Sequence, residues 1–204
     1  MKTHIRALYL ITILFCLHVH AATFTWTNTA GGNWSNANNW SPNTVPGQLN
    51  TLGSSDDVLI TNAGTYTVVL DTGASPSFWD IHSLTLGAAS GAQTLVMTNR
   101  ILYAAPLTIT NGGVLSDFGS SFHAVINVQN GGKLFSTNGS YFVNPLTISS
   151  GGIFSTRGSV TVESGGSMLM NGTLTVSNGT LTVNAPATNT GTWTVNSGAA
   201  LSVG

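Results

Sequence analysis

Apolar and polar residues alternate along most of this chain, and one phrase built on that alternation returns six times in its second half. Each copy has two apolar residues separated by Thr or Asn, a short link to Asn-Gly or Ser-Gly, and then another apolar residue. The first Gly of the copies stands at positions 112, 131, 151, 165, 179 and 198. Alternation with a period of two predicts β-strands, and a phrase that recurs in this way predicts a solenoid.

The step between these glycines is long from 112 to 131, from 131 to 151 and from 179 to 198, and shorter from 151 to 165 and from 165 to 179. Three short strands and the three turns that join them take about 18 to 22 residues. The long steps match this length and therefore predict an all-β fold, a parallel β-helix in which each step is one coil. The shorter steps fall below the length of a three-sided coil and predict a flattened or two-sided one.

The paired apolar positions predict two interior ladders, because side chains two positions apart on a strand share a face. The first apolar residues of the copies form one ladder: Leu107, Ile126, Leu146, Val160, Leu174 and Trp193. The second ones form the other: Ile109, Val128, Ile148, Val162, Val176 and Val195. We expect the Thr or Asn between them to point outward, and the Gly steps to form corners with positive φ.

A competing hypothesis is an antiparallel sandwich. Asn-Gly between alternating strands, as in residues 174–183, is a strong hairpin signal. We favour the β-helix because every copy runs in the same order at a nearly constant offset, which a sandwich does not require.

Residues 22–55 are rich in Trp and Asn and show little alternation. We expect this stretch to be a capping segment over the first coil, because an open solenoid end exposes unpaired backbone and apolar side chains. The β-helix repeats are expected over residues 56–204, with fainter copies at 58–66 and 84–86, and to continue beyond the C-terminus given.

Residues 1–21 have the features of a secretory signal peptide. Lys2 and Arg6 precede an apolar run that is too short to span a membrane, and small residues lead to a cleavage site after Ala21. The expected location is therefore secreted or at the cell surface. The single Cys, Cys16, would leave with this peptide, so the mature chain has no disulfide.

The expected mature chain carries very few charges. Its three cations are Arg100, Lys133 and Arg157, and its six acids are Asp56, Asp57, Asp71, Asp80, Asp117 and Glu163. Nucleic-acid binding needs clustered Lys and Arg, so a nucleic-acid partner is excluded. A polybasic membrane patch is missing for the same reason, and we expect no membrane insertion by this segment.

Aromatic, Gly, Asn and Asp residues follow one another in a fixed pattern through the N-terminal third: Trp26, Gly31-Gly32-Asn33-Trp34, Asn39-Trp40, Pro46, Asp56-Asp57-Val58 and Val69-Leu70-Asp71. This pattern resembles the opening of large secreted bacterial surface proteins with autotransporter-associated β-strand repeats, and the later Gly-Gly phrases resemble those repeats. The resemblance implies a β-helix passenger region, usually in a longer polypeptide that ends in an outer-membrane barrel or a sorting signal. It identifies no ligand.

Four tryptophans are candidates for carbohydrate stacking: Trp26, Trp34, Trp40 and Trp79. An exposed indole can cover the apolar face of a sugar ring while polar neighbours bond to its hydroxyls. The alternative is that these rings plug the end of the solenoid, and we favour this for Trp34 and Trp40, because a cap must bury large side chains.

The acids indicate no catalytic, metal or cofactor site. Asp56, Asp57 and Asp71 are possible Ca²⁺ ligands, but no calcium-binding loop motif accompanies them, and Asp next to a strand more often bonds to turn amides. Asp117 and His123 are the nearest to an acid–base pair. We nevertheless interpret Asp117 and the other dispersed charges, Asp80, Glu163, Arg100, Lys133 and Arg157, as isolated surface groups.

Together these observations predict a non-enzymatic stalk or adhesin-like region of a secreted or cell-surface protein. Its expected partners are surface glycans or other cell-surface proteins. The alternative is a carbohydrate-binding or carbohydrate-active module of a larger secreted enzyme.

Overall fold

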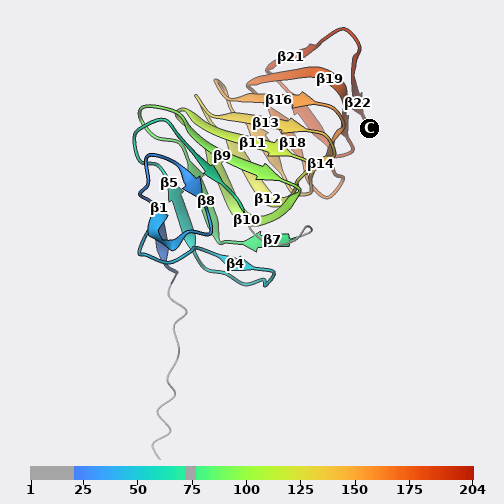
Figure 1. Ribbon diagram of the computed structural model, residues 1–204. Helices are drawn as coiled ribbons and strands as arrows, with labels where there is room; N and C mark the ends of the chain where they lie inside the picture. Colours follow the sequence, from blue (N-terminus) through green and yellow to red (C-terminus); the bar gives the residue numbers. More distant parts are fainter. Residues whose placement is uncertain (1–20, 72–76) are drawn as a thin grey trace, which may run out of the picture.

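Successive coils of the chain stack on one another to form a parallel β-helix, as predicted (Figure 1). The computed structural model describes residues 21–71 and 77–204. The signal peptide predicted over residues 1–21 lies outside the described residues except for Ala21. No helix in the described part of the chain is long and apolar enough to cross a membrane.

Each coil has three sides, and strands on the same side pair in parallel with the coils above and below. The first side contains β2 (Gly32–Asn33), β6 (Tyr66–Val69), β9 (Gln93–Thr98), β11 (Gly113–Phe118), β13 (Lys133–Thr137), β16 (Ile153–Arg157), the start of β19 (Thr173–Val183) and β21 (Thr192–Val195).

The second side contains β7 (Ser77–Asp80), the start of β10 (Arg100–Ile109), the start of β12 (Ser121–Val128), β14 (Ser140–Phe142), β17 (Val160–Val162), the end of β19 and β22 (Ala199–Val203). The third side contains β1 (Thr23–Trp26), β5 (Asp57–Ile60), β8 (Ser83–Leu86), the ends of β10 and β12, β15 (Leu146–Ile148), β18 (Met168–Met170) and β20 (Ala187–Asn189).

The register corrects the two predicted ladders. Leu107, Ile126 and Leu146 do share a ladder on the third side, and it continues to Met168. Val160, however, pairs with Ser140 and Leu181 on the second side. Leu174 lies between Phe154 and Trp193 on the first side.

The second predicted ladder divides in the same way. Ile109, Val128 and Ile148 lie on the third side. Val162 lies on the second side, and Val176 and Val195 on the first. The phrase recurs at all three corners of the coil, because every corner needs the same strand ending and the same turn. Copies of the phrase therefore do not occupy equivalent positions.

The prediction of a flattened coil was wrong for the same reason. On the first side, equivalent inward residues are almost evenly spaced along the chain: Leu95, Leu115, Leu134, Phe154, Leu174 and Trp193. The shorter steps between glycines cross only two of the three sides of a coil: β16 and β17 lie between Gly151 and Gly165, and β18 and the start of β19 lie between Gly165 and Gly179. The sandwich hypothesis was also wrong, because Asn178 and Gly179 lie within β19, which pairs in parallel on both of its halves.

The Gly-Gly corners combine two separate requirements. The first Gly has a positive φ at three of these corners, +79° at Gly112, +76° at Gly131 and +76° at Gly151, whereas Gly165 does not have the positive φ that was expected. The second Gly lies against the coil below: a Cβ on Gly113 would stand 2.2 Å from the Leu86 carbonyl oxygen, and one on Gly132 would stand 2.3 Å from that of Ile109. The second Gly is therefore needed for close stacking of the coils.

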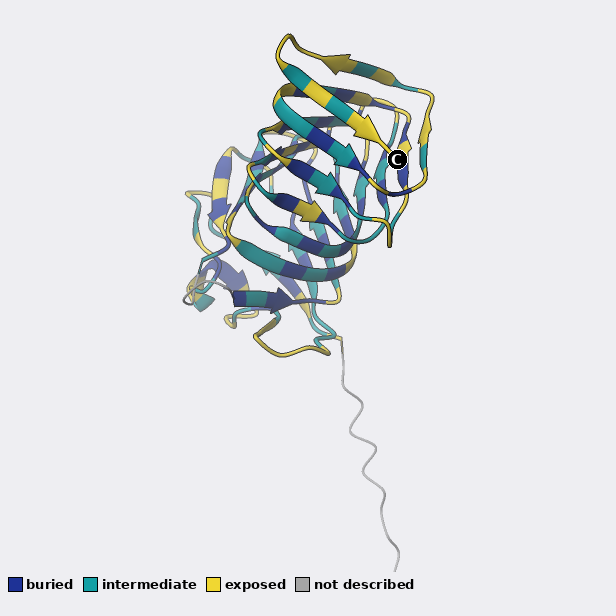
Figure 2. Ribbon diagram, turned by 90° about the vertical axis from the view of Figure 1, so that its right-hand side faces the viewer, coloured by how far each residue is buried: buried dark blue, intermediate teal, exposed yellow. Residues whose placement is uncertain are grey.

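Buried residues alternate with partly or fully exposed ones along the strands (Figure 2). Leu115, Leu134 and Phe154 in the first-side ladder are fully buried, and each buried side chain of this size contributes about 1.5–3 kcal/mol. The alternation weakens in the last coil, where Val195 and Val203 remain 42% and 49% exposed.

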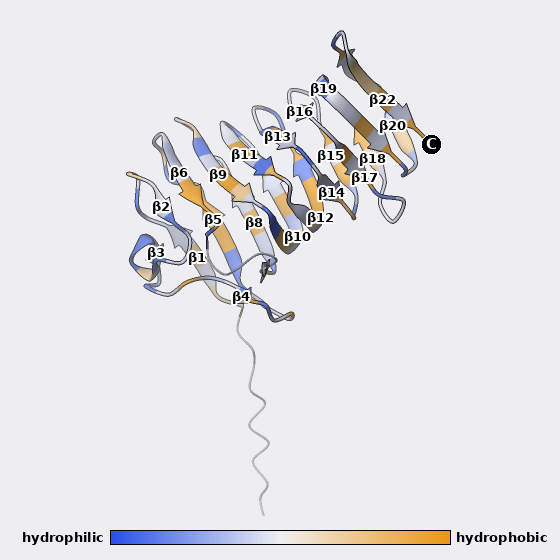
Figure 3. Ribbon diagram, turned by 45° about the vertical axis from the view of Figure 1, so that its right-hand side comes forward, coloured by the Kyte–Doolittle hydropathy of each residue, from blue (hydrophilic) through white to orange (hydrophobic). Residues whose placement is uncertain are grey.

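The solenoid begins inside the segment predicted as a cap. β1 already pairs in parallel with β5, so the first coil starts at Thr23 and not at residue 56. The rest of residues 22–55 contributes β3 (Trp40–Ser41), which pairs antiparallel with β1, a short 3₁₀ helix at Ala37–Asn39, and β4 (Gln48–Leu49), which pairs antiparallel with β7. These elements lie at the N-terminal end of the rod (Figure 3).

Candidate functional site

The four tryptophans proposed for sugar stacking form one packed cluster. The ring centroids of Trp26 and Trp40 are 4.9 Å apart, those of Trp34 and Trp40 are 4.8 Å apart, and those of Trp34 and Trp79 are 6.0 Å apart. All four side chains are buried, and none is more than 4% exposed. Stacking on a sugar requires an exposed ring face, and none of these rings provides one.

The indole N–H groups of the cluster all donate to backbone carbonyls. Trp40 Nε1 donates to Trp34 O at 2.7 Å, and Trp34 Nε1 donates to Pro46 O at 3.2 Å. Trp26 and Trp79 donate to Asn28 O and Asp71 O. Buried rings with satisfied polar atoms are typical of a structural plug. The cluster closes the N-terminal end of the core.

Three of the acids fix the loops around this plug. Asp71 accepts from Ser35 N at 2.8 Å, which is the turn-amide role predicted for it. Asp56 accepts from Gly47 N at 2.8 Å, and Asp80 accepts from Gly53 N at 2.6 Å and from Ser54 N at 2.7 Å. Each bond joins the irregular N-terminal segment to a carboxylate in or close to a strand: Asp80 ends β7, Asp56 directly precedes β5, and Asp71 follows β6. These carboxylates therefore hold the shape of the cap.

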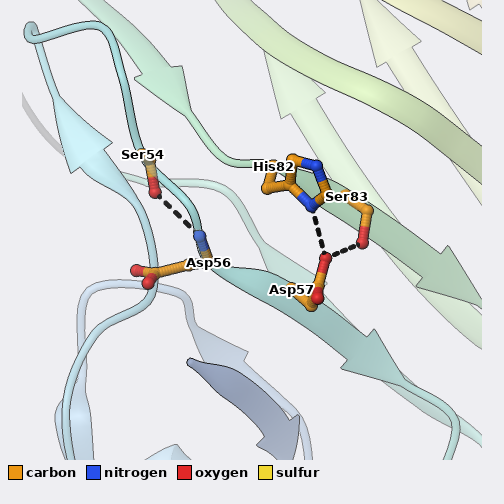
Figure 4. A network of polar contacts seen from close by, with 5 residues as sticks. All are labelled: Ser54, Asp56, Asp57, His82 and Ser83. Atoms are coloured by element: carbon orange, nitrogen blue, oxygen red, sulfur yellow. Dashed lines mark hydrogen bonds and ion pairs between the residues drawn. The ribbon is translucent and has the colours of Figure 1, made fainter. Parts of the chain in front are cut away.

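Asp57 differs, because it bonds to side chains and not to turn amides. His82 Nδ1 lies 2.9 Å from Asp57 Oδ1, and Ser83 Oγ donates to the same oxygen. Figure 4 shows both groups pointing at this oxygen, while the Asp56 carboxylate points away from them. The Ser83 bond, and after it the His82 contact, hold the pKa of Asp57 below its usual range.

This Ser–Asp–His group is not an activated nucleophile. A serine nucleophile needs a base that takes its proton, and the base is usually an imidazole oriented by a carboxylate. Here the serine hydroxyl bonds to the carboxylate, and the imidazole bonds to that carboxylate beside it. The His82 side chain is also 59% exposed. The group connects β5 to the next coil.

A shallow hollow of about 240 Å³ lies next to this group, lined in part by Asp80, His82, Tyr103 and His123. The Tyr103 and His123 rings stack with centroids 4.5 Å apart. Partial burial lowers the pKa of His123, which favours the neutral imidazole at neutral pH. Asp80 Oδ2 accepts from the Gly53 and Ser54 amides, and no hydrogen bond or ion pair joins Asp80 to His123 among the described residues.

Asp117 and His123 are not brought together as an acid–base pair. Asp117 points into the core from β11 and is 2% exposed, whereas His123 lies on the outer surface of β12. The interpretation of Asp117 as an isolated surface charge was therefore wrong. The alternation gave a signal for this: Asp117 lies two positions after the inward Leu115.

Buried serines surround the Asp117 carboxylate. Ser136 Oγ donates to Asp117 Oδ2 at 2.9 Å, and Ser120 N donates to Asp117 Oδ1 at 3.1 Å. Burial raises the pKa of Asp117, and the hydrogen bonds from these serines and Ser140 oppose that effect only in part. The carboxyl group is enclosed and has no route to a substrate.

The other charged residues are dispersed. Arg100 begins β10, Lys133 begins β13, Arg157 ends β16, and Glu163 lies in the corner after β17. Among residues 21–71 and 77–204, no group of three His, Cys, Asp or Glu side chains is placed to hold a metal ion. A comparison of this chain with protein-family models, curated proteins and solved structures gives no match.

Proposed function

We propose that this chain is a non-enzymatic structural rod, a stalk or adhesin-like segment of a secreted or cell-surface protein. The observation that carries the proposal is the outer surface of the coils. On the third side, Thr85, Thr108, Asn127 and Thr147 lie on one another in register, all pointing outward. Such polar ladders solubilise a rod without providing reactive groups.

The distribution of the acids supports the same proposal. Hydrolysis of a glycosidic bond uses two carboxyl groups about 5 to 10 Å apart across a groove. Asp56, Asp71 and Asp80 are bonded to loop amides, and Asp117 is enclosed in the core. No pair of described carboxylates therefore faces an open groove with both groups free.

The resemblance to secreted bacterial surface proteins and the features of residues 1–21 support a location outside the cell. A chain with almost no charged residues and many Thr, Ser and Asn suits a long surface structure, because repeated weak contacts can add along a rod. In this function, length and stiffness matter more than any single side chain.

Changing the number of coils tests the rod directly. Lys133, Ile153 and Thr173 occupy equivalent positions in successive coils, so a second copy of residues 133–172 inserted after Gly172 keeps the register. We expect this variant to fold cooperatively and to be longer by about 10 Å in small-angle scattering, since two coils add two strand spacings. A control that duplicates residues 133–162 ends on the wrong side of the coil and should lose cooperative folding.

A hydrolysis screen separates the rod from the carbohydrate-active alternative. The chain starting at Ala22 is incubated with a panel of plant and bacterial polysaccharides, and release of reducing ends is measured. We expect no release. Release by the chain that is lost in Asp57→Asn would show a catalytic carboxylate and would overturn the proposal.

A further inference from the structure

A hollow of about 540 Å³ opens on the outer surface of the first side, where β13, β16 and β19 lie next to one another. Its lining includes Phe135, Thr137, Ser155, Arg157, Ser177 and Asn178. These side chains combine an aromatic ring, a guanidinium group, hydroxyl groups and an amide. The hollow lies on the middle and C-terminal coils, away from the tryptophan plug.

The hollow coincides with an irregularity in the first side. Thr156 pairs with Val176, but Arg157 pairs with Asn178, so Ser177 is an extra residue in β19. The other pairings of described first-side strands keep a regular register. A β-bulge re-aims the side chains around it and is frequent next to functional sites. Here it displaces the ladder at the position of Arg157.

The outer surface around the hollow is positively charged. The outward residues of β9, β11, β13, β16 and β21 include Lys133 and Arg157 but no Asp or Glu. Within residues 21–71 and 77–204, the ion pair that forms joins His82 to Asp57. Arg157 has no carboxylate partner there. An exposed guanidinium without a partner can form two parallel hydrogen bonds to a ligand carboxylate.

One exposed aromatic ring lines the hollow together with this cation, and a second lies two coils away in the same register. Phe135 is 38% exposed and lines the hollow, and Phe118 is 47% exposed in register with Thr137. An exposed aromatic ring on a hydrophilic rod is suited to cover the apolar C–H face of a sugar. Ser155, Ser177 and Asn178 provide donors and acceptors for sugar hydroxyl groups.

We propose that this hollow is a binding site for an acidic polysaccharide, with Arg157 bonded to the carboxylate of a uronic acid residue and Phe135 packed against its ring. The parallel coils continue the surface along the rod through Thr175 and Thr194, which lie in register on β19 and β21. An extended polymer can therefore occupy several coils, and two cations are too few for a nucleic acid. The site would give the rod a defined ligand class.

Binding assays with matched polymers test this site. The chain starting at Ala22 is immobilised, and its affinity is measured for polygalacturonate, alginate and hyaluronate. Fully methyl-esterified polygalacturonate provides the same sugar without charge, and polyglutamate provides carboxylates without a sugar. We expect binding of at least one acidic polysaccharide, with affinity at least tenfold weaker for the methyl ester and for polyglutamate.

Variants then assign the binding to the hollow. Losing a charge-assisted bidentate contact costs roughly tenfold or more in affinity, so we expect that loss in Arg157→Gln and a smaller loss in Arg157→Lys. Thr188→Glu changes the net charge by the same amount on the third side, where Thr188 is exposed, and should bind as the parent does. Circular dichroism verifies that each variant is folded.

Three results would overturn the proposal: no binding to any of the three acidic polysaccharides, equal binding to polyglutamate, or unchanged binding by folded Arg157→Gln. The first result leaves the structural rod intact, because the coil-duplication experiment does not depend on a ligand. The second would identify a general polyanion surface. The third would place any glycan site elsewhere on the rod.

Discussion

The buried carboxyl group of Asp117 provides the sharpest test of the core. Within the first-side ladder, it lies between Met97 and Ser136, and its oxygens accept from Ser136 Oγ and Ser120 N. We predict that Asp117→Asn makes the protein more stable at neutral pH. Asparagine keeps the shape and an acceptor for Ser120 N, while its amide can donate to Ser136 Oγ, whose hydroxyl hydrogen can rotate away.

The direction of the pH dependence follows from the raised pKa of Asp117. The folded protein binds this proton more tightly than the unfolded chain does, because burial disfavours the carboxylate. Stability from this group is therefore fully present below the ordinary carboxyl pKa of about 4 and is lost as the pH rises through the raised pKa. The asparagine variant does not lose stability in this way. Its unfolding free energy should therefore exceed that of the parent by an amount that is absent in acid and grows towards neutral pH.

The magnitude of the polar network can be measured with Asp117→Ala in acid, where the carboxyl group is neutral. That change leaves two buried donors, Ser136 Oγ and Ser120 N, without their partner. Each unsatisfied buried donor costs about 1–3 kcal/mol, so we expect a loss of about 2–6 kcal/mol.

Urea unfolding of the parent, Asp117→Asn and Asp117→Ala, followed by circular dichroism between acid and neutral pH, measures these differences. Subtracting variant from parent at each pH removes the contributions of the other acids, including Asp57 with its lowered pKa. If the unfolding free energy of the parent rises relative to that of Asp117→Asn as the pH rises, the hydrogen bonds to the carboxylate outweigh the effect of burial. The argument about this carboxyl group would then be wrong.

Other predictions concern the stacking of the coils and the plug. Leu134→Ala should cost about 2–5 kcal/mol of unfolding free energy, measured with urea, because Leu134 is fully buried between Leu115 and Phe154. Gly113→Ala should prevent cooperative folding, since its Cβ meets a carbonyl oxygen at 2.2 Å, whereas Gly139→Ala, with φ +82° and open space around it, should cost only about 1 kcal/mol; equal losses would contradict the stacking argument. Trp34→Ala should lower the unfolding free energy by about 3–5 kcal/mol without changing glycan binding. A change in binding with no change in stability would show that Trp34 contacts the glycan.

The alternation and the recurring Gly steps were sufficient to predict the parallel β-helix, because each depends only on local geometry. They were insufficient to place Val160 and Leu174, which lie on different sides of the coil from Leu107. The phrase describes a strand that ends at a corner, and the coil has three such corners. Which corner a copy occupies depends on pairing with residues one full coil away along the chain. The residues of the phrase itself contain no information about that pairing.

The side-chain roles were harder to predict than the backbone. Asp117 was interpreted as a surface charge although the alternation places it inward, two positions after Leu115. A carboxyl group inside a core is expected only where donors surround it, and those donors come from the next corner and the next coil. A plug was expected only for Trp34 and Trp40, whereas Trp26 and Trp79 are buried with them. The burial of these rings as one cluster depends on antiparallel pairing of β3 with β1, which no local pattern indicates.

The hollow at Arg157 was invisible in the sequence because it results from one extra residue. Ser177 belongs to a regular copy of the phrase, and only the shift of register between β16 and β19 shows that it interrupts the stack. A regular ladder of Thr and Ser gives the same shallow surface on every coil and selects nothing. One bulge beside an unpartnered cation and an exposed ring makes one coil different from its neighbours. In a rod built from near-identical coils, such interruptions are where specific recognition can arise, and they should be sought in the register and not in the repeat.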